Sequence, residues 1–580
     1  MTRSIGSVDR IRWMAALLAS AVLALVTAIG LHHWQLAPVS IDASAAPAAP
    51  AGSSAPLDPR IASLAAGHPQ RSIEVIAQFK ATVSPERARW DVSRVQGHVF
   101  GDLHIINALA VRLTAGQARR LASSPDVHAV SLNAVVKSEG GPLGPGGLGS
   151  SGGPAGPGLP TRPGGPTGPL ASQQNTYDQT LRVDDLWKQG INGAGVGVAV
   201  IDTGIDGGLR DFRSEGGRSS RVIATAVTNP DATTVTDSYG HGTDVAGIIA
   251  GNGNNLSPSN PLRGEYVGVA PDANLISVKV SDENGNATVL DVIYGLQFAI
   301  DHESAYNIRV VNLSLDAETP QSYKTDPLDA AVESAWMHGI VVVAAAGNRG
   351  DVPGAVQYAP ANDPYVITVG AVDEQGQTNP ANDVIASWSS QGTTQDGFQK
   401  PDVYAPGAHI VSVLAPGSYF ASACPPCEVG GEYIRTSGTS MAAPMISGLV
   451  ADVLQVHPDW TPDQVKGALT SPGVESNSMP EVDAGKVIAL QQPPAADAGL
   501  TPNALVDGTT GDIDYSRSTW SRSTWSIATG ALSAAFARSS WSCTCTASES
   551  STSNSGDVDS SRSTWSRSSW STYVKPGAAG

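Results

Sequence analysis

The sequence predicts an α/β protein whose parallel sheet is flanked by helices, preceded by a small α+β domain. For the larger domain, five near-continuous apolar runs indicate strands buried on both faces, and helical stretches lie between them. A segment rich in Gly and Pro lies between the two domains. Gly and Pro supply 21 of the 30 residues from 140 to 169, without a three-residue period. This composition predicts an extended, flexible linker at 139–175.

The first 45 residues carry the features of an export signal. Arg3, Arg10 and Arg12 precede an uncharged run from 13 to 31, and this order of charge and apolar residues is typical of a secretory signal. The run approaches the length of a membrane span, which is about 20 residues. Small residues at 43–45 suit signal cleavage. The sequence therefore leaves two outcomes open, a cleaved signal peptide with secretion or a retained membrane anchor outside the cytoplasm.

Residues 72–137 predict the small α+β domain. An alternating pattern indicates a first strand, and Ser84 with Pro85 is typical of a helix start. Thr114 and Gln117 form a capping-box pattern for a second, short helix. The expected elements are strands at 72–79, 103–113 (one or two) and 127–136, and helices from 85 to about 96 and at 115–123.

The small domain is basic, whereas the chain is acidic. Residues 71–137 hold nine Lys or Arg and five Asp or Glu, a net charge of +4. The whole chain carries −18, so the remainder carries −22 by subtraction. An acidic chain disfavours nucleic acid as a partner. The charge difference also indicates that the basic domain can dock on the rest of the protein.

Runs of apolar residues define the strands of the larger domain. They are too continuous for strands with one solvated face, which would alternate. The runs span residues 196–201, 274–280, 308–315, 339–346 and 365–372, and a helical pattern covers 288–300. In such folds, catalytic and binding residues gather at the carboxyl ends of the strands.

Four polar residues lie at the ends of apolar runs or at the starts of helices and are therefore candidate catalytic residues. Asp202 ends the run in "VAVIDTGID", and Asn348 ends the run in "VVVAAAGN". His241 starts a small-residue helix in "GHGTDVAGIIAG", and Ser440 in "RTSGTSMAAPMISGLV" precedes an apolar helix. Singly, each has a structural explanation, such as a turn, a core histidine or a helix cap. Together, a carboxylate, an imidazole, an amide and a hydroxyl indicate a serine hydrolase.

The segments "DTGID", "GHGT", "AAAGN" and "GTSMAAP" occur in this order. They resemble the signature blocks of the subtilisin-like serine proteases, the subtilases, and the order Asp, His, Ser distinguishes that family from chymotrypsin-like enzymes and α/β-hydrolases. The resemblance covers roughly residues 180–490 and implies a catalytic domain at 176–490. The unit at 72–137 is similar to the inhibitory propeptide of the same family.

The resemblance implies a role for each candidate residue. Asp202 would orient the imidazole of His241, which accepts the hydroxyl proton of Ser440. Asn348 and the backbone N–H of Ser440 would hold the oxyanion formed from the attacked peptide carbonyl. The implied reaction passes through an acyl-enzyme and requires no cofactor.

The resemblance also implies a substrate-binding region. Ser314, Leu315 and Asp316, with the opposite segment Ala345, Ala346 and Gly347, would pair with an extended polypeptide and wall the primary specificity pocket. Gln357 would lie near the base of this pocket.

Three of these positions depart from the family pattern. Asp316 stands where glycine is usual, Gln357 where a small residue is usual, and Asp244 where "HGTH" has its second histidine. We expect the volume of Gln357 to disfavour large aromatic substrate residues. Asp316 would attract a basic side chain and Arg349 would oppose it.

Structural calcium is the one metal that the resemblance implies. Asp211 follows Asp202 at a spacing that matches a calcium ligand of the family. No other ligand is assigned by the sequence, so the metal site itself is unknown.

The four cysteines suit a protein outside the cytoplasm. Cys424 and Cys427 form "CPPC", and Cys543 and Cys545 form "CTC". The spacing of a zinc site is missing, because neither a second CxxC nor neighbouring histidines are present. A small loop disulfide between Cys424 and Cys427 is therefore favoured over a metal or redox site.

The segment at 491–580 is a low-complexity tail. "SRSTWSRSTWS" recurs as "SRSTWSRSSWS", and five of the twelve tryptophans lie here. The composition favours disorder. The alternative is a segment that binds a cell-surface polymer or a second copy, because tryptophan beside arginine makes good contacts.

The sequence thus predicts a serine endopeptidase that is made as a zymogen and is inhibited by its own propeptide. Its partners would be polypeptide substrates, and a membrane or cell-surface attachment is left open. A catalytically idle surface-binding scaffold with the same fold is the alternative from another class. The sequence does not separate a degradative enzyme from a processor of particular exported proteins.

Overall fold

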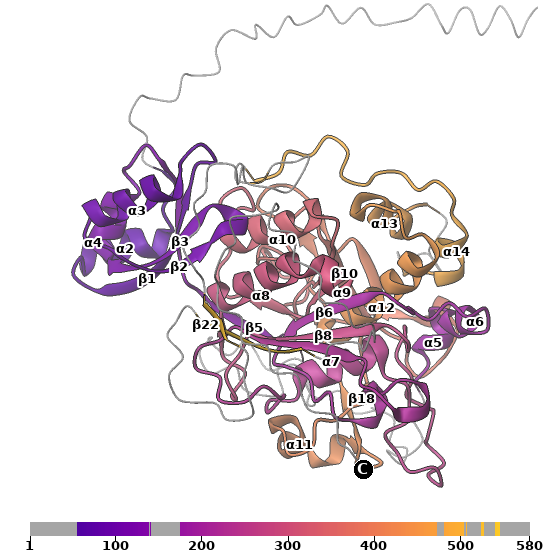
Figure 1. The fold of residues 1–580 in the computed structure, drawn as a ribbon. Coiled ribbons are helices and arrows are strands. Elements are labelled where there is room, and N and C mark those ends of the chain that lie inside the picture. Colours follow the sequence, from indigo (N-terminus) through magenta and orange to yellow (C-terminus); the bar gives the residue numbers. More distant parts are fainter. Residues whose placement is uncertain are drawn as a thin grey trace, which may run out of the picture. The chain divides into compact units, whose positions relative to one another are not determined.

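The computed structural model describes residues 55–138, 140, 175–472, 481–503 and 506, and the backbone of 524–526 and 540–545 (Figure 1). The expected export signal at 1–45 and nearly all of the expected linker at 139–175 lie outside these described residues.

The small domain is an antiparallel sheet of four strands with helices packed on it. The strand order is β2-β3-β1-β4. The elements are α2 (Pro59–Gly67), β1 (Ser72–Phe79), α3 (Pro85–Arg94), β2 (His98–Leu103), η1 (His104–Ile106), β3 (Ala108–Thr114), α4 (Ala115–Leu121) and β4 (Val127–Leu132). The predicted capping box is confirmed, because Thr114 and Gln117 bond each other's backbone N–H groups at the start of α4.

Two predicted strands of the small domain are wrong in part. The run at 103–113 is interrupted by η1, which ends at Asn107 in a left-handed conformation with φ 45°. The run at 127–136 breaks at Asn133 and Ala134, because these two residues bond the backbone of Leu290 and Val289 in the larger domain. The strand therefore leaves its own sheet and continues as β5 (Val135–Ser138).

The larger domain is built on a ten-stranded, mostly parallel sheet, as the apolar runs predict. The order is β14-β13-β12-β10-β6-β8-β7-β22-β21, and β17 pairs with β13. The strands are β6 (Gly197–Asp202), β7 (Val222–Val227), β8 (Asn274–Lys279), β10 (Ile308–Leu313), β12 (Val341–Ala345), β13 (Ile367–Asp373), β14 (Val384–Ile385), β17 (Val403–Pro406), β21 (Thr524–Ser526) and β22 (Ser540–Cys545).

Three smaller sheets surround this one. The first has the order β11-β5-β9, the second joins β15 to β16, and the third has the order β18-β20-β19. Their remaining strands are β9 (Ala287–Thr288), β11 (Leu315–Ala317), β15 (Gly392–Thr393), β16 (Gln399–Lys400), β18 (Ile410–Val413), β19 (Glu428–Val429) and β20 (Tyr433–Thr436). The predicted strand at 308–315 is therefore two strands, separated at Ser314.

Helices cover both faces of the large sheet. They are α5 (Tyr177–Thr180), α6 (Val183–Trp187), α7 (His241–Ala250), α8 (Val289–Asp301), α9 (Glu303–Tyr306), α10 (Pro327–Met337), α11 (Tyr419–Ala423), α12 (Thr439–Val456), α13 (Pro462–Leu469) and α14 (Ala484–Ala489). Figure 1 shows α8 and α10 on one side of β6 and β8, and α7 on the other. Helices α7 and α12 pack against each other.

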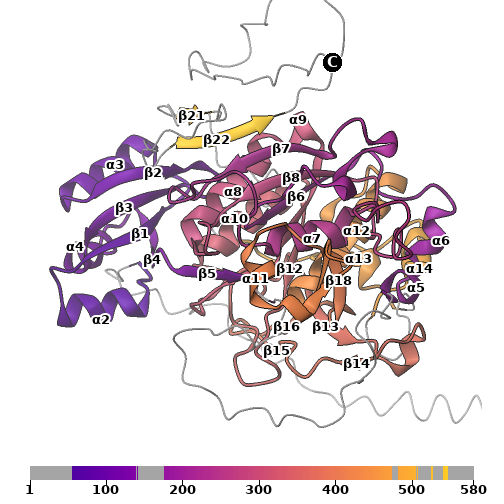
Figure 2. The same cartoon turned by 90° about the horizontal axis from the view of Figure 1, so that it is seen from below.

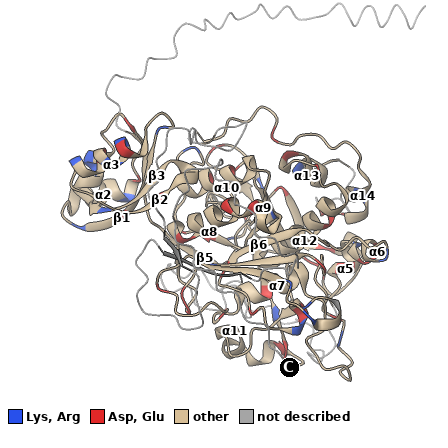
Figure 3. Ribbon diagram, viewed as in Figure 1, with Lys and Arg blue, Asp and Glu red and all other residues tan. Residues whose placement is uncertain are grey.

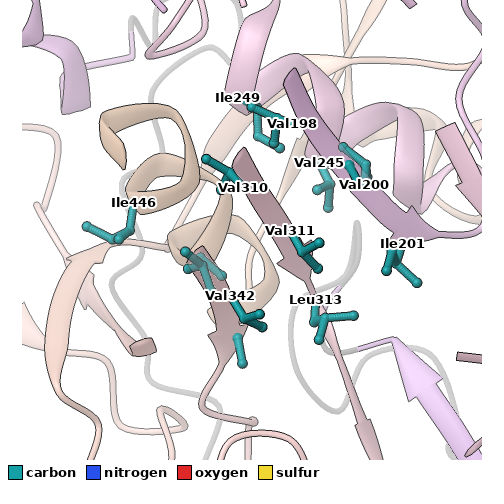
Figure 4. Close-up of a cluster of buried hydrophobic side chains, with 14 of the residues drawn as sticks. Val198, Val200, Ile201, Val245, Ile249, Val310, Val311, Leu313, Val342 and Ile446 are labelled. Carbon is teal, nitrogen blue, oxygen red and sulfur yellow. The ribbon is translucent and has the colours of Figure 1, made fainter. Parts of the chain in front are cut away.

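The core of the larger domain lies between these helices and the sheet. Val198 of β6, Val310 of β10 and Val342 of β12 are fully buried, and Figure 4 shows them near Ile249 of α7 and Ile446 of α12. The central strands are almost free of charged residues (Figure 3). Burial of such side chains stabilises the fold by about 1.5–3 kcal/mol each.

Helix α12 is apolar around its whole circumference because it lies inside the protein. Among the described residues, it is the one helix whose length and hydropathy would suit a membrane span, and 89% of its apolar window is buried in the fold. Composition alone is weak support for a span, and the position of α12 explains its hydropathy.

The folded part of the chain continues past residue 490. Asp497 forms an ion pair with Lys466 of α13 at 3.0 Å, and the N–H of Asn503 donates to Glu333 of α10 at 2.6 Å. Farther along, β22 pairs antiparallel with β7, and Figure 2 shows the two strands side by side. Most of the expected low-complexity tail lies outside the described residues.

The predicted disulfide between Cys424 and Cys427 is confirmed. Their Cα atoms are 5.3 Å apart, and the bridge closes the short turn that follows α11.

Candidate active site

The parallel pairing of three strands sets the location of the candidate site. Strand β10 pairs with β6 on one side and with β12 on the other. Their carboxyl ends therefore lie at one edge of the sheet. Asp202 is the last residue of β6, Ser314 follows β10, and Asn348 lies three residues after β12. Two helices begin beside this edge, α7 at His241 and α12 one residue before Ser440.

Asp202 and His241 form a buried pair. The His241 Nδ1 lies 2.8 Å from Asp202 Oδ1, and neither side chain is exposed. The N–H of Thr203 also donates to Asp202 Oδ1 at 2.7 Å, which fixes the carboxylate. His241 Nε2 has no hydrogen-bond partner. The carboxylate therefore orients the ring and leaves one nitrogen for other chemistry.

Opposing effects act on the pKa of His241. Burial lowers this pKa, whereas the neighbouring charge and hydrogen bond of Asp202 raise it, and the net result is a raised pKa. The charge of Asp237 adds to the upward shift. The imidazolium form is therefore stabilised, as expected for a base that accepts a proton.

Ser440 occupies the second position of α12, inside the protein. Its hydroxyl donates to the Ser314 carbonyl oxygen at 3.0 Å, and the Ser314 hydroxyl donates to the Ser440 carbonyl oxygen at 3.0 Å. Helix α12 has Gly438 at its N-cap, without a side-chain cap. The interpretation of Ser440 as a capping residue is therefore wrong. In this structure the hydroxyl bonds the segment between β10 and β11 and not His241.

Asn348 is held in place by the residue before Ser440. Its Oδ1 accepts hydrogen bonds from the N–H of Thr439 at 3.0 Å and from the Thr439 hydroxyl at 3.3 Å. The same hydroxyl accepts from the N–H of Gly347 at 3.1 Å. The amide oxygen is thereby occupied, which leaves the NH₂ group as the donor toward a ligand. The sequence prediction missed Thr439, although it lies inside the motif "GTSMAAP".

The expected substrate strand is occupied by the small domain. Strand β5 pairs antiparallel with β11, with Ser138 opposite Leu315 and Lys137 opposite Asp316. On its other edge β5 pairs with β9. Thus Leu315 and Asp316 hold an extended chain as an added strand, which is the geometry of peptide recognition by strand addition.

Gly140, two residues after β5, lies at the amino terminus of α12. Gly140 lies so near the start of α12 that a Cβ on it would be 3.0 Å from the Ser437 carbonyl oxygen and 3.3 Å from Gly438 Cα. Ser138 thus lies on β11, and Gly140 lies beside the residues that precede Ser440.

The pocket residues are only partly brought together. Ala345 ends β12, and Ala346 and Gly347 follow it near Asp316, whose Oδ2 would be 3.3 Å from a Cβ on Gly347. Gln357 lies beside Gly354 instead, where its Oε1 would be 3.1 Å from an added Cβ. In the described part of the chain, no hydrogen bond or ion pair links Gln357 to Asp316. Its place at the base of the pocket stays a prediction.

Asp316 and Arg349 behave differently from the expectation of two opposed charges. They form an ion pair with each other, in which Arg349 Nη2 lies 3.1 Å from Asp316 Oδ1 and Nη1 contacts Oδ2. The guanidinium also stacks on Tyr358, 3.8 Å from its ring centre. The N–H of Arg349 donates to the Ser390 hydroxyl at 2.9 Å. The sequence analysis did not identify Tyr358 or Ser390 as neighbours of Arg349.

Asp244 lies one helical turn after His241 and is fully buried. Its Oδ2 accepts a hydrogen bond from the Thr436 hydroxyl at 2.9 Å. Burial raises the pKa of Asp244 to about 8. The carboxyl group of Asp244 is therefore mostly protonated, and so uncharged, near neutral pH.

The structure places Asp211, the expected calcium ligand, in a buried position against Tyr433. Its Oδ2 accepts a hydrogen bond from the Tyr433 hydroxyl at 2.8 Å, and burial raises its pKa to about 6. Calcium takes six to eight oxygen ligands as a rule. Throughout the described ranges, no group of three or more His, Cys, Asp or Glu residues is arranged to hold a metal ion.

Comparison with known proteins identifies the family. Residues 193–480 match the family model described as the subtilase family. "Subtilisin" from Bacillus pumilus is 37% identical over 293 residues, which cover 50% of this chain and 88% of that protein. The chain belongs to the subtilase family. This subtilase is also 40% identical to "Serine protease AprX" from Bacillus subtilis strain 168 over 286 residues, 48% of the chain and 62% of AprX.

The match to other relatives is less complete. "Subtilisin E" from the same organism is 38% identical over 293 residues, 50% of the chain and 64% of that protein. The subtilase thus spans less than two thirds of AprX and of subtilisin E. A solved structure, fervidolysin from Fervidobacterium pennivorans, described as a keratinolytic enzyme related to subtilisin, has a TM-score of 0.53 and 24% identity over 76% of this chain and 64% of that chain. This likeness shows the fold.

The raised pKa of His241 generates a prediction for the mature subtilase. Only neutral imidazole can accept a proton, so kcat/KM should fall as the pH drops through the His241 pKa, with a midpoint above the ordinary value of 6.5. A pH–rate profile on a short peptide measures this midpoint. Asp202→Asn should lower kcat by about 10⁴-fold, because the tautomer is no longer fixed. A midpoint below 6.5 in the wild type would contradict the role of Asp202.

Proposed function

We propose that this subtilase is a serine endopeptidase that hydrolyses polypeptides through Asp202, His241 and Ser440. The observation that carries the proposal is the buried Asp202–His241 pair, whose Nε2 has no partner and which lies at the same sheet edge as the start of α12. An oriented base beside a serine at a helix amino terminus is the arrangement that activates a hydroxyl nucleophile.

In the proposed reaction, the Ser440 hydroxyl exchanges its hydrogen bond with Ser314 for one with His241 Nε2. Its oxygen attacks the peptide carbonyl carbon while His241 takes the proton. His241 then gives this proton to the leaving amine, the C–N bond breaks and an acyl-enzyme remains. Water attacks the ester with His241 again as the base, and Ser440 recovers its proton as the carboxylic acid product leaves. Base, acid and nucleophile are all side chains, so the proposed reaction uses no cofactor.

Asn348 is the proposed side-chain donor to the oxyanion, together with the N–H of Ser440. Its amide oxygen is already engaged by Thr439, which aims the NH₂ group elsewhere. Loss of one such donor lowers kcat about 10²- to 10³-fold, a value known from a subtilisin.

We propose further that the small domain at 72–137 is an inhibitory propeptide. Support comes from β5, which occupies the edge of β11 that a substrate would use. The contact is extended by main-chain groups. The N–H of Val289 donates to the Ala134 carbonyl at 2.9 Å, and the N–H of His104 donates to Gln297 Oε1 at 3.1 Å. A bound propeptide therefore excludes substrate.

The proposed inhibitory contact is mainly apolar and main-chain in character. Ile105 and Ile106 of the small domain are fully buried in the same core cluster as the larger domain. Its ion pairs are reached by solvent, and the side chains of the His104–Asp301 pair are 18% and 29% exposed. Lys137 pairs with Glu318, and these side chains are 46% and 40% exposed. Exposed pairs contribute only about 0–1 kcal/mol each. The basic charge of the propeptide is thus a minor part of its affinity.

The proposed site of action is outside the cytoplasm. The disulfide between Cys424 and Cys427 supports an oxidising compartment, and the export signal at 1–45 supports passage through the membrane. Secretion and retention as a membrane anchor both agree with these features. A catalytically idle scaffold, the alternative from the sequence, would not need a buried histidine with an unused nitrogen.

The nucleophile can be tested by its effect on maturation. Ser440→Ala should accumulate as a precursor that still carries residues 72–137, because no hydroxyl is left to attack the junction. Gel electrophoresis and intact mass of the purified protein measure the processing. Ser422→Ala, an exposed serine of α11, is the matched control and should mature normally. Normal processing of purified Ser440→Ala, free of other proteases, would overturn the assignment.

The positions of Ser138 and Gly140 predict the mature amino terminus. Ser138 is the last residue paired with β11, and Gly140 lies against Gly438. We therefore expect the cut between Ser138 and Gly140, so that the mature chain begins at residue 139 or 140. Amino-terminal sequencing of the first processed form measures this position. A first cut within 145–175 would contradict the register.

The propeptide proposal predicts inhibition in trans. Residues 55–138 added to the mature enzyme should inhibit peptide hydrolysis, and a segment ending at Ala134 should inhibit far less, because it lacks β5. Inhibition should weaken as salt rises, but less than on loss of β5, because the ion pairs are exposed. The inhibition constants at low and high ionic strength measure both effects. Equal inhibition by the two segments would refute the role of β5.

A further inference from the structure

The ion pair between Asp316 and Arg349 joins the two segments that flank the substrate. Asp316 belongs to β11, which carries the added strand, and Arg349 directly follows Asn348. A Cβ on Gly347 would be 2.8 Å from Arg349 Nη1 and 3.3 Å from Asp316 Oδ2. The pair therefore lies across the space between β11 and the segment that follows β12.

The contacts around the Asp316–Arg349 pair hold both side chains in one arrangement. Both guanidinium nitrogens reach the carboxylate, and the Asp316 side chain is 2% exposed. Stacking on Tyr358 fixes the plane of the guanidinium. Bidentate pairing with one buried partner is stronger than a single exposed ion pair.

We propose that the Asp316–Arg349 pair neutralises the primary specificity pocket and thereby selects uncharged residues before the scissile bond. The inference rests on the proposed peptidase function. An acidic substrate side chain would have to take Arg349 from Asp316, and a basic one would have to take Asp316 from Arg349. Each exchange leaves a charge without its partner, so the wild-type enzyme disfavours both charges.

A purely structural role for the pair makes a different prediction. If the pair only tied β11 to the segment after β12, its loss would lower the rate on every peptide by the same factor. A pocket-neutralising pair changes the preference between opposite charges instead. Asp316→Asn removes the acidic partner of Arg349 in this pair and should favour an acidic residue. Arg349→Gln leaves Asp316 uncompensated and should favour a basic residue.

The experiment measures kcat/KM of the mature enzymes on four peptides that differ only at the residue before the cleaved bond: Ala, Leu, Glu or Lys. Relative to wild type, the Glu/Lys ratio should rise roughly 10-fold or more in Asp316→Asn and fall by a similar factor in Arg349→Gln. The double variant should return the ratio to near the wild-type value. Lys188→Gln, which removes a cation from an exposed pair with Asp184, is the charge-matched control and should leave the ratio unchanged.

Each outcome bears on the proposal. Opposite shifts in the two single variants support it, and an unchanged Glu/Lys ratio in both overturns it. Melting temperatures report whether each variant folds, and if one single variant does not fold, the other measures the same ratio in the opposite direction. If wild type and Ser440→Ala cleave no peptide at all, the proposed peptidase function fails instead. If the wild type cleaves Ala and Leu peptides while the ratio stays fixed in the variants, only the pocket inference fails.

Discussion

The parallel pairing of β6, β10 and β12 is the constraint on which the site depends. Strands that run in one direction and pair in register must end at one edge, so Asp202, Ser314 and Asn348 come together although they are far apart in sequence. The helices α7 and α12 are buried against this sheet and against each other. Core packing therefore fixes the amino termini of both helices. It thereby also fixes the positions of His241 and Ser440, which lie in the first turns.

The same sheet edge would be shared by the proposed propeptide and the proposed substrate, which both pair with β11. Strand β11 continues from β10 after Ser314, so its free edge lies beside Ser440 by chain connectivity. Any extended segment that pairs with this edge is brought to the nucleophile, whether it belongs to a substrate or to the small domain. With β5 in place, Ser440 bonds the Ser314 carbonyl and not His241. In this structure, therefore, β5 is paired with β11, Asp202 orients His241, and the Ser440 hydroxyl is bonded to Ser314.

Burial on both faces made the core strands predictable from sequence, because it leaves long apolar runs such as that of β12. Helix α4 was predictable from its capping box, because that motif involves only residues close in sequence. The signal for α2 is also local, Asp58 before Pro59, and it lies ahead of the predicted start of the small domain at residue 72. The break at Asn133 could not be predicted, because it depends on hydrogen bonds to α8. The pairing of Asp316 with Arg349 likewise arises only when the fold joins positions 33 residues apart.

The formal charge of the chain overstates the acidity of the folded protein near neutral pH. Burial raises the pKa of Asp244 to about 8 and the pKa values of Asp291 and Asp326 to about 7. A carboxyl group with a raised pKa in the folded state stays protonated while its unfolded counterpart ionises near pH 4. Stability therefore falls as the pH rises from about 4 toward each raised pKa, and no further loss follows above it.

The protonation of the buried carboxyl groups reduces the electrostatic attraction between the small domain and the rest of the chain. Part of the charge of −18 belongs to buried groups that are neutral near pH 7, so the contrast between a basic domain and an acidic remainder is smaller than the composition indicates. Asp291 lies in α8 next to Leu290 and Val289, whose N–H groups bind the small domain. The raised pKa of Asp291 reduces the buried negative charge at this contact, where its neighbours Asp231 and Glu74 are also acidic. Main-chain bonds and apolar burial, rather than net charge, therefore hold the two domains together.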